Sequence, residues 1–244
     1  MTALSIDKLS MRFGGLYALE NVSLEVAVGE RRGIIGPNGA GKTTFFNVVC
    51  GYIVPSAGRI TLFGRDITRM PPHQRVAQGL GRTFQKMNVF LNLTVSENIQ
   101  LALVPKGLGP GIFGRVDKAV LTACARMTEH FGLHEKSDTP VKNLSYGEQR
   151  IVEILLALAL EPRFLLLDEP MAGLSGEEVG KITGIIKGLP GEITVVIIEH
   201  DLDVIFEVAQ NLTVLHYGKV IADGRADEVA RNERVREVYL TRGM

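Results

Sequence analysis

The chain contains one segment in which glycines, a lysine and hydroxyl residues have a diagnostic spacing, Gly36-Pro37-Asn38-Gly39-Ala40-Gly41-Lys42-Thr43-Thr44. It matches the phosphate-binding loop pattern G-x-x-x-x-G-K-[ST] at every fixed position. Residues 32–35 before it predict a short buried strand, and residues 43–50 after it predict a helix. Backbone N–H groups and a helix N-terminus in this setting attract an anion. We expect Lys42 to reach the β- and γ-phosphates of a nucleotide and the Thr43 hydroxyl to ligate Mg²⁺.

The overall composition narrows the class of protein. The chain has 244 residues with 27 basic and 27 acidic side chains, so no net charge draws it to nucleic acid. Its length fits one domain, with room for a subdomain. Cys50 and Cys124 lie in apolar helical sequence and predict reduced core residues of a cytosolic protein. No signal-peptide pattern opens the sequence, and no apolar run approaches the roughly 20 residues of a membrane span, which predicts a soluble chain.

Acidic residues and a histidine follow two further predicted strands. The apolar run 164–167 predicts a buried strand, and Asp168 and Glu169 come directly after it. Ligands of open α/β sheets bind at the carboxyl ends of strands. We therefore expect Asp168 to hold Mg²⁺ through water and Glu169 to polarise an attacking water. The β-branched run 194–198 predicts another central strand, and His200 follows it, which favours a functional over a structural histidine.

A second anion site is predicted at the start of a helix over residues 145–159. Ser145 and Glu148 have the S-x-x-E spacing of a capping box, and Gly147 lies between them. A hydroxyl, a glycine and free N–H groups at a helix N-terminus can bind an anion. Alone, this pattern fits an ordinary helix start. The position of this pattern just before the acidic motif at residues 164–170 favours an anion-binding site over an ordinary helix start.

The remaining pattern predicts an α/β fold with an inserted helical part. Strands are expected at 21–28, 59–63 and 81–84, and a hairpin at 212–222 around Tyr217-Gly218. The alternation in the first of these predicts that one strand face carries Val22, Leu24, Val26 and Val28. Helices are expected from 71, 94–104, 117–131, 175–189, 226–231 and 234–240, with a loop at 107–114. We expect one domain, 1–244, with a nucleotide-binding core at 1–87 and 159–225, a helical subdomain at 88–158 and a helical tail at 226–244.

Two features allow more than one interpretation. Phe13, in a glycine turn, either stacks on a base or belongs to the core at a strand end, and composition favours the core. A basic stretch with one acid, Asp66, predicts either a solvated face or a binding surface near a partner. Its basic residues are Arg59, Arg65, Arg69, Arg75, Arg82 and Lys86.

In this order and spacing, the motifs resemble those of the ATP-binding cassette ATPases over nearly the whole chain. Gly36–Thr44 resembles Walker A, and Leu165–Asp168 with Glu169 resembles Walker B and the catalytic glutamate. Leu144–Gln149 is similar to the signature motif that defines the family. The resemblance also places Gln85 in the Q-loop.

The same resemblance assigns roles to further residues. His200 matches the switch histidine, and Phe13 matches the aromatic residue that stacks on adenine, which overrides the preference for the core. The implied fold is an α/β P-loop NTPase of ABC type, with a mixed sheet core, an antiparallel β part and an inserted α-helical subdomain. The implied cofactors are ATP and Mg²⁺, with water attacking the γ-phosphate in line. Two cassettes would enclose two ATP molecules head to tail, so that Ser145 and Gly147 complete the partner's site.

The residues that the resemblance implies fall into three sets. The catalytic set is Lys42, Gln85, Glu169 and His200. The metal set is Thr43, Gln85 and Asp168. The nucleotide contacts are Phe13, Gly36, Pro37, Asn38, Gly39, Ala40, Gly41, Lys42, Thr43, Thr44, Ser145 and Gly147.

Smaller features resemble the cassettes of importers for branched-chain amino acids. They are Gly81–Gln85, the glycine-rich 107–114, Ala172–Ser175, Ile198–Asp201 and the ending 236–240. In the third of these, Ser175 stands where the family usually carries an aspartate. The subgroup implies an ATPase on the cytoplasmic face of the inner membrane, as a homodimer or as a heterodimer with a paralogous cassette. Its implied partners are integral membrane permease subunits and, indirectly, a periplasmic or extracellular solute-binding protein, and no nucleic acid.

Other functions within and outside transport remain open. Relatives of this subgroup serve urea import, and an exporter-type lipopolysaccharide cassette has a similar size and tail. A soluble mechanoenzyme of translation or DNA repair is a different class. One set of motifs and about sixty residues between Gln85 and Ser145 leave no second cassette and no long coiled coil. A regulatory binder without hydrolysis is disfavoured by the presence of Glu169 and His200.

Overall fold

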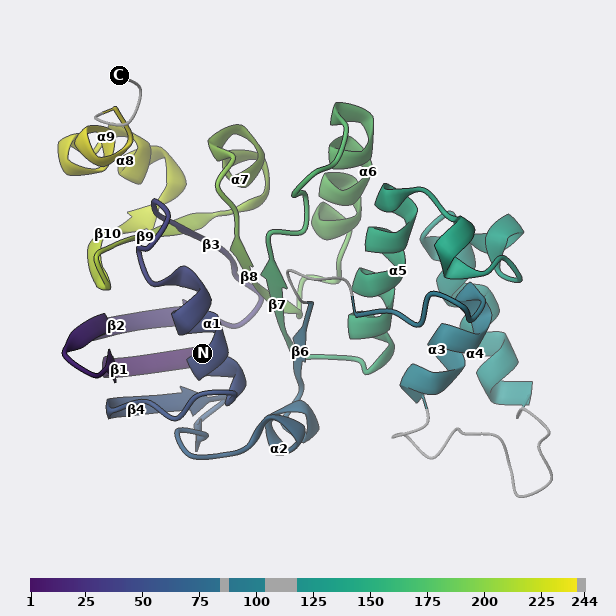
Figure 1. Cartoon of the computed structure of the whole chain (residues 1–244), viewed down its shortest axis with the longest axis horizontal. Coiled ribbons are helices and arrows are strands. Elements are labelled where there is room, and N and C mark those ends of the chain that lie inside the picture. Colours follow the sequence, from purple (N-terminus) through teal and green to yellow (C-terminus); the bar gives the residue numbers. More distant parts are fainter. Residues whose placement is uncertain (84–87, 104–117, 241–244) are drawn as a thin grey trace. The chain divides into compact units, whose positions relative to one another are not determined.

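The computed structural model describes residues 1–83, 88–103 and 118–240 of the chain (Figure 1). These residues form two compact units, each with its own internal packing. One unit comprises Met1–Arg82, Arg163–Glu169 and Ile186–Met244, and it contains the β-sheets. The other comprises Thr83–Pro162 and Pro170–Ile185 and is helical. The helical unit therefore takes in residues 170–185 in addition to the inserted segment.

The sheet-containing unit begins with an antiparallel sheet in the order β2-β1-β4-β5. Its strands are β1 (Thr2–Phe13), β2 (Leu16–Ala27), β4 (Ala57–Leu62) and β5 (Arg65–Asp66). The expected half-buried strand is confirmed, since Val22, Leu24 and Val26 are buried. The prediction that Val28 lies on the same face is wrong. The strand ends at Ala27, before a turn at Gly29, and Val28 is exposed.

A second, mixed sheet has the order β10-β9-β3-β8-β7-β6. All neighbouring strands in it are parallel except for the hairpin pair β9 and β10. The register sets Asp168 beside Ile198, so the polar residues that follow β7 and β8 emerge at one edge. The strands are β3 (Arg31–Ile35), β6 (Leu80–Arg82), β7 (Phe164–Asp168), β8 (Thr194–Ile198), β9 (Asn211–His216) and β10 (Lys219–Arg225).

The core of this unit gathers around α1 (Lys42–Cys50). Phe45 and Phe46 of α1 share one buried cluster with residues of both sheets, such as Leu24 and Leu166. Burying an aromatic side chain of this size is worth about 1.5–3 kcal/mol, so the helix is a strong link between the sheets. Cys50 at the end of α1 is a free, buried thiol, as expected, and Cys124 is likewise. Burial raises the pKa of Cys50 to about 11 although Arg82 opposes this shift, which keeps the thiol protonated.

The basic stretch 59–86 does not form a single surface. Arg75, in the short helix α2 (Pro72–Ala77), is fully buried. Its guanidinium donates to the carbonyls of Val48 and Val49 at the end of α1, at 2.8 and 2.6 Å. A cation at a helix C-terminus satisfies carbonyls that have no partner within the helix. The alternative of a solvated face is therefore wrong for Arg75, and Lys86 lies outside the described residues.

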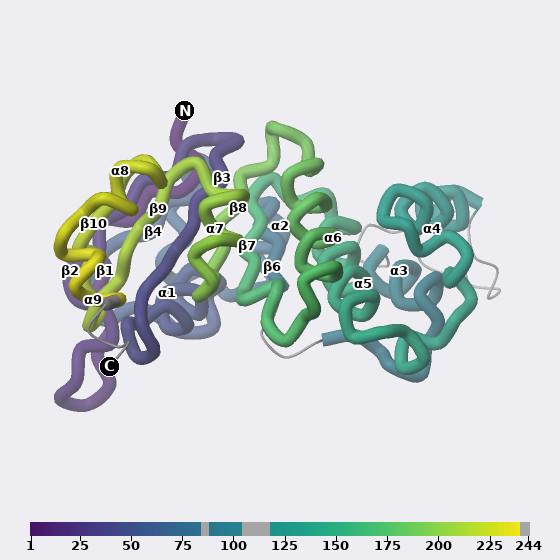
Figure 2. The backbone as a smooth tube through the Cα atoms, turned by 90° about the horizontal axis from the view of Figure 1, so that it is seen from above, coloured from purple at the N-terminus to yellow at the C-terminus, as the bar shows by residue number. Residues whose placement is uncertain are grey.

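The helical unit contains α3 (Val95–Leu103), α4 (Lys118–His130), α5 (Tyr146–Ala159) and most of α6 (Gly176–Lys187) (Figures 1 and 2). The expected capping boxes open α3 and α5. Glu97 N donates to Thr94 Oγ1 at 3.1 Å, and Thr94 N donates to Glu97 at 2.8 Å. Positive φ at Gly132 closes the segment after α4, as expected. The expected loop at 107–114 falls outside the described residues.

Three more helices belong to the sheet-containing unit. They are α7 (Leu202–Val208), α8 (Ala226–Arg231) and α9 (Glu233–Leu240). The last two confirm the helices expected at 226–231 and 234–240, and they lie beside β10 in both views (Figures 1 and 2). Among the described residues, no helix combines the length and hydropathy of a bilayer span.

Candidate functional site

The phosphate-binding loop joins β3 to α1, as the sequence predicts. Two of its glycines are required by the backbone path. A Cβ on Gly36 would lie 2.2 Å from the Leu215 carbonyl oxygen, and one on Gly41 would lie 2.5 Å from that of Ala18. Both glycines also have positive φ. The loop is thus held closely between neighbouring backbone segments, with its amide groups at the start of α1.

Lys42 folds its side chain back into this loop. Its Nζ donates to the Gly36 carbonyl at 2.5 Å and to the Pro37 carbonyl at 3.1 Å, and the residue is buried. The positive charge is therefore held beside the loop amides. Together they form a concentrated positive site, which is the chemistry that a polyphosphate requires.

Asp168 ends β7 and is almost fully buried, with 3% exposure. Its Oδ2 accepts from Arg82 Nη2 at 3.1 Å, and Arg82 Nη1 donates to Asn47 Oδ1 at 2.9 Å. The guanidinium also lies over the ring of Tyr52, 5.5 Å from its centroid. A buried carboxylate needs such a partner, because removing an unpaired charge from water is very unfavourable. Sequence reasoning assigned Arg82 to a basic surface and so missed this pairing.

Glu169 and His200 follow adjacent strands at the same edge of the sheet. Glu169 has a φ of 47°, a left-handed conformation, and its N–H donates to the Ile198 carbonyl at 3.0 Å. The His200 side chain is 62% exposed, and its Nδ1 lies 4.0 Å from the buried carboxylate of Glu199. Sequence reasoning missed Glu199, because nothing in the local pattern signals a buried acid at that position. Asp201 accepts from the first amides of α7 and so fixes the chain after His200.

Phe13 lies at the tip of the β1–β2 hairpin, paired with Leu16. It is 50% exposed, so the composition-based preference for a core residue is wrong. The same hairpin approaches the phosphate-binding loop, where Ala18 lies against Gly41. An exposed aromatic ring on a strand pair that contacts this loop is free to stack on a planar ligand.

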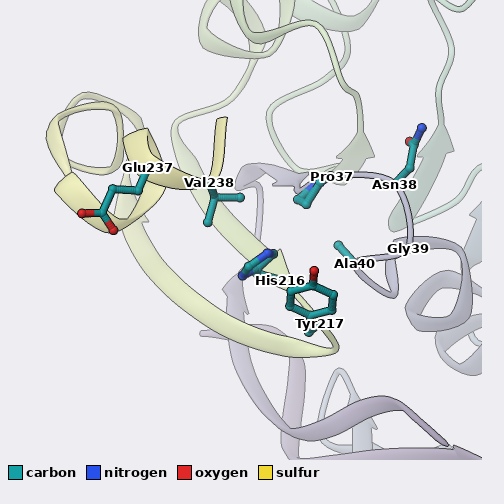
Figure 3. Close-up of a pocket in the computed structure, with 8 residues that line it drawn as sticks. All are labelled: Pro37, Asn38, Gly39, Ala40, His216, Tyr217, Glu237 and Val238. Atoms are coloured by element: carbon teal, nitrogen blue, oxygen red, sulfur yellow. The ribbon is translucent and has the colours of Figure 1, made fainter. Parts of the chain in front are cut away.

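A hollow of about 540 Å³ opens beside the phosphate-binding loop (Figure 3). Its walls come from the loop, from the turn between β9 and β10, and from α9. They are Pro37, Asn38, Gly39, Ala40, His216, Tyr217, Glu237 and Val238. The tail of the chain thus lies next to the phosphate-binding loop. Burial raises the pKa of the neighbouring Tyr239 to about 12, although the Gly36 backbone opposes this shift.

Ser145 and Gly147 open α5 in the helical unit. The capping box is confirmed: Glu148 N donates to Ser145 Oγ at 3.2 Å, and Ser145 N donates to Glu148 Oε2 at 3.0 Å. Burial acts to raise the pKa of Glu148, but hydrogen bonds from Lys136 and the Ser145 amide lower it below its usual value. An unexpected carboxylate, Glu178 of α6, accepts from the Ser145 hydroxyl and the Gly147 amide.

The expected site residues are divided between the two units. The loop 36–44, Asp168, Glu169 and His200 belong to the sheet-containing unit and follow the carboxyl ends of β3, β7 and β8. Ser145 and Gly147 belong to the helical unit. Gln85 lies outside the described residues. Among the described residues, no group of three or more His, Cys, Asp or Glu side chains lies together as a metal site.

A phosphate-binding loop after a central parallel strand, with acids at the ends of neighbouring strands, defines a P-loop nucleotide-binding protein. The sequence model of the ABC transporter family matches residues 19–172, and that of the branched-chain amino acid ATP-binding cassette transporter matches residues 219–240. The chain belongs to the ABC transporter family. It is an ATPase with the fold that its sequence predicts.

Individual relatives cover almost the whole chain. The high-affinity branched-chain amino acid transport ATP-binding protein LivG of Salmonella typhimurium is 37% identical over 97% of both chains. The lipopolysaccharide export system ATP-binding protein LptB of Acidithiobacillus ferridurans is 38% identical over 91% of this chain and 90% of that one. The crystal structure of the ADP conformation of MJ1267, an ATP-binding cassette of an ABC transporter, has a TM-score of 0.89 at 31% identity and covers 98% and 99% of the two chains.

Proposed function

We propose that this chain is the ATP-hydrolysing subunit of an importer for branched-chain or other hydrophobic amino acids. It acts on separate permease subunits from the cytoplasmic face of the membrane, and a solute-binding protein delivers the cargo. The observation that carries this proposal is the match of residues 219–240 to the branched-chain cassette model. The LivG relative, which aligns over 97% of both chains, supports it.

The phosphate-binding loop holds the nucleotide in this proposal. The loop amides and Lys42 bind the β- and γ-phosphates, and Phe13 stacks on the adenine. This is supported by the buried Lys42 Nζ, which the Gly36 and Pro37 carbonyls hold inside the loop, and by the exposed Phe13 ring. Thr43 and Asp168 are hard oxygen donors that suit Mg²⁺, with Gln85 as a further ligand. When bound, the ion neutralises charge on the phosphates.

Glu169 and His200 act on the reaction itself. Glu169 accepts a hydrogen bond from the attacking water and orients it toward the γ-phosphate, and His200 contacts the γ-phosphate. The proposal is supported by the register of β7 and β8, whose ends carry these two residues. The left-handed backbone at Glu169 is a strained conformation of the kind that gathers at functional sites.

A second cassette completes each site. Ser145 and Gly147 of one chain bind the γ-phosphate held by Lys42 of the other, so two ATP molecules lie between two chains arranged head to tail. The support is chemical: the Ser145 hydroxyl and the Gly147 amide already bind a carboxylate at the N-terminus of α5. The partner is a second copy or a paralogous cassette.

Lipopolysaccharide export is the second candidate. It is favoured by the LptB relative, which is 38% identical over 91% of this chain. The match at residues 219–240 gives import the stronger support. Urea-type import remains a related alternative within the same class.

Uptake by the host cell tests the proposal. Deleting the gene is expected to remove high-affinity uptake of radiolabelled leucine, isoleucine and valine. The wild-type chain restores it, and Lys42→Ala does not, because this variant lacks the phosphate-binding cation. Uptake of leucine that is unchanged by the deletion, together with loss of surface lipopolysaccharide, would support export instead. Unchanged uptake of labelled urea in the same strain excludes the related alternative.

A further inference from the structure

The carboxylate of Glu178 occupies the anion site at the start of α5. Its Oε1 accepts from the Gly147 amide at 3.1 Å and from the Ser145 hydroxyl at 3.4 Å. A Cβ on Gly147 would lie 2.4 Å from this oxygen, so the glycine lets the carboxylate approach the backbone. These are the same donors that the proposed function assigns to a γ-phosphate. One site cannot hold both anions.

The other oxygen of Glu178 is anchored by Ser175. Oε2 accepts from the Ser175 amide at 3.0 Å and from its hydroxyl at 2.9 Å. These bonds, first those from the Ser175 amide and hydroxyl and then those from Gly147 and Ser145, lower the pKa of Glu178 below its usual value. The carboxylate is therefore charged at neutral pH and held by four donors.

The serine at position 175 allows this contact with the Glu178 carboxylate. The resemblance to the family predicts an aspartate at this position. An ionised aspartate has no donor and would repel Glu178, whereas a serine hydroxyl donates to it. Around the contact lies a hollow of about 250 Å³, lined by residues that include Ile151 and Lys181. Glu178 thus has space to swing away from α5 when a stronger anion arrives.

We propose that Glu178 closes the signature site of the nucleotide-free chain and must be displaced by ATP bound to the second cassette. The inference rests on the head-to-tail dimer of the proposed function. The Glu178 carboxylate and the γ-phosphate compete for the Ser145 hydroxyl and the Gly147 amide. Glu178 therefore raises the ATP concentration that is needed to form the dimer.

ATP-dependent dimerisation of a hydrolysis-deficient chain provides the test. In the Glu169→Gln background, we titrate Mg²⁺–ATP and follow the molar mass by sedimentation velocity. Adding Glu178→Ala is expected to lower the ATP concentration at half-dimerisation by about two- to fivefold, the range for exposed charge interactions. Glu178→Gln keeps an acceptor oxygen without the charge and is expected to give an intermediate midpoint. This second variant retains more of the helix cap.

Glu177→Ala is the matched control. Glu177 is the preceding residue on α6 and pairs with Lys181 at 2.7 Å. Removing it takes away the same charge from the same turn, but not the contact with α5, so the midpoint is expected to stay unchanged. A midpoint that is unchanged or raised in both Glu178 variants, or lowered equally by Glu177→Ala, would overturn the inference alone. Absence of any dimer with ATP in the Glu169→Gln chain would overturn the head-to-tail dimer, and the displacement with it.

Discussion

Arg82 and Asp168 form a buried ion pair, with Nη2 and Oδ2 3.1 Å apart and both side chains less than 10% exposed. The pair joins the ends of the neighbouring strands β6 and β7. Arg82 also reaches Asn47 on α1, the helix that follows the phosphate-binding loop. The acid proposed to hold Mg²⁺ is thus positioned by a cation three residues before Gln85.

Breaking this pair is expected to destabilise the fold. Arg82→Gln leaves the buried Asp168 without its cation, and the free energy of unfolding should fall by about 3 kcal/mol or more. Urea denaturation measures the change. Arg65→Gln is the control, because Arg65 is exposed and donates to Gln78, and its effect should stay within about 0.5 kcal/mol. Equal stability of the two variants would contradict a structural role for the pair.

Glu169→Gln is expected to separate binding from hydrolysis. The amide cannot accept a proton from water as the carboxylate does, so kcat should fall by about 10²-fold or more, while ATP binding persists. The dimer should then accumulate with ATP and elute early in size-exclusion chromatography. A chain that elutes as a monomer with saturating ATP would argue against two shared sites.

Tyr239 makes stability sensitive to alkaline pH. Its hydroxyl is buried without a hydrogen-bond partner among the described residues, and burial raises its pKa from 10.0 to about 12 although the Gly36 backbone opposes the shift. Because the folded-state pKa is the higher one, this contribution to stability is complete below pH 10 and is lost as the pH rises toward 12. Tyr239→Phe should therefore lose less stability than the wild type between these pH values.

Urea titrations at pH 8, 10 and 11 measure this difference. The buried Cys50, whose pKa is raised to about 11, contributes in the same direction in both proteins and cancels in the comparison. At pH 8 the variant should be as stable as the wild type or slightly more so, because it removes a buried hydroxyl that lacks a partner. Parallel pH profiles of the two proteins would contradict the assignment.

The exposed part of the basic stretch is predicted to lie near the permease. Arg59, Arg65 and Arg69 are exposed, whereas Arg75 and Arg82 are internal. Arg69→Glu should weaken co-purification with the permease subunits and leave the ATPase rate of the isolated chain unchanged. Arg231→Glu, at an exposed position at the end of α8, is the control with the same charge change. If Arg69→Glu leaves assembly and transport unaffected, the prediction that this surface lies near the permease is wrong.

Local features of the chain could be predicted from its sequence. The phosphate-binding loop, the capping boxes at Thr94 and Ser145, and the hairpin at Tyr217-Gly218 all agree with the structure. Each depends on residues within a few positions of one another, whose backbone geometry and hydrogen bonds are set by their own chemistry. Continuous apolar runs likewise predict the buried strands β7 and β8.

The strand β1 was missed because its period is interrupted. Its register against β2 shifts between Ile6 and Leu9 and again near Met11, and Lys8 has a positive φ. Each irregularity moves the following side chains to the other face of the sheet, so the alternation that signals a strand is lost. The pairing with β2 and β4 nevertheless keeps this strand in place.

The partners of charged residues are the clearest example of what only the tertiary structure decides. Arg75 and Arg82 carry the same sequence signal as Arg65, yet their partners are carbonyls of α1 and the acid at the end of β7. Glu178 reaches Ser145 across 33 positions of the chain. Local spacing predicts the phosphate-binding loop, because its pattern lies within nine consecutive residues. The partner of each buried charge depends instead on strand order and helix packing, which bring distant residues within hydrogen-bonding distance.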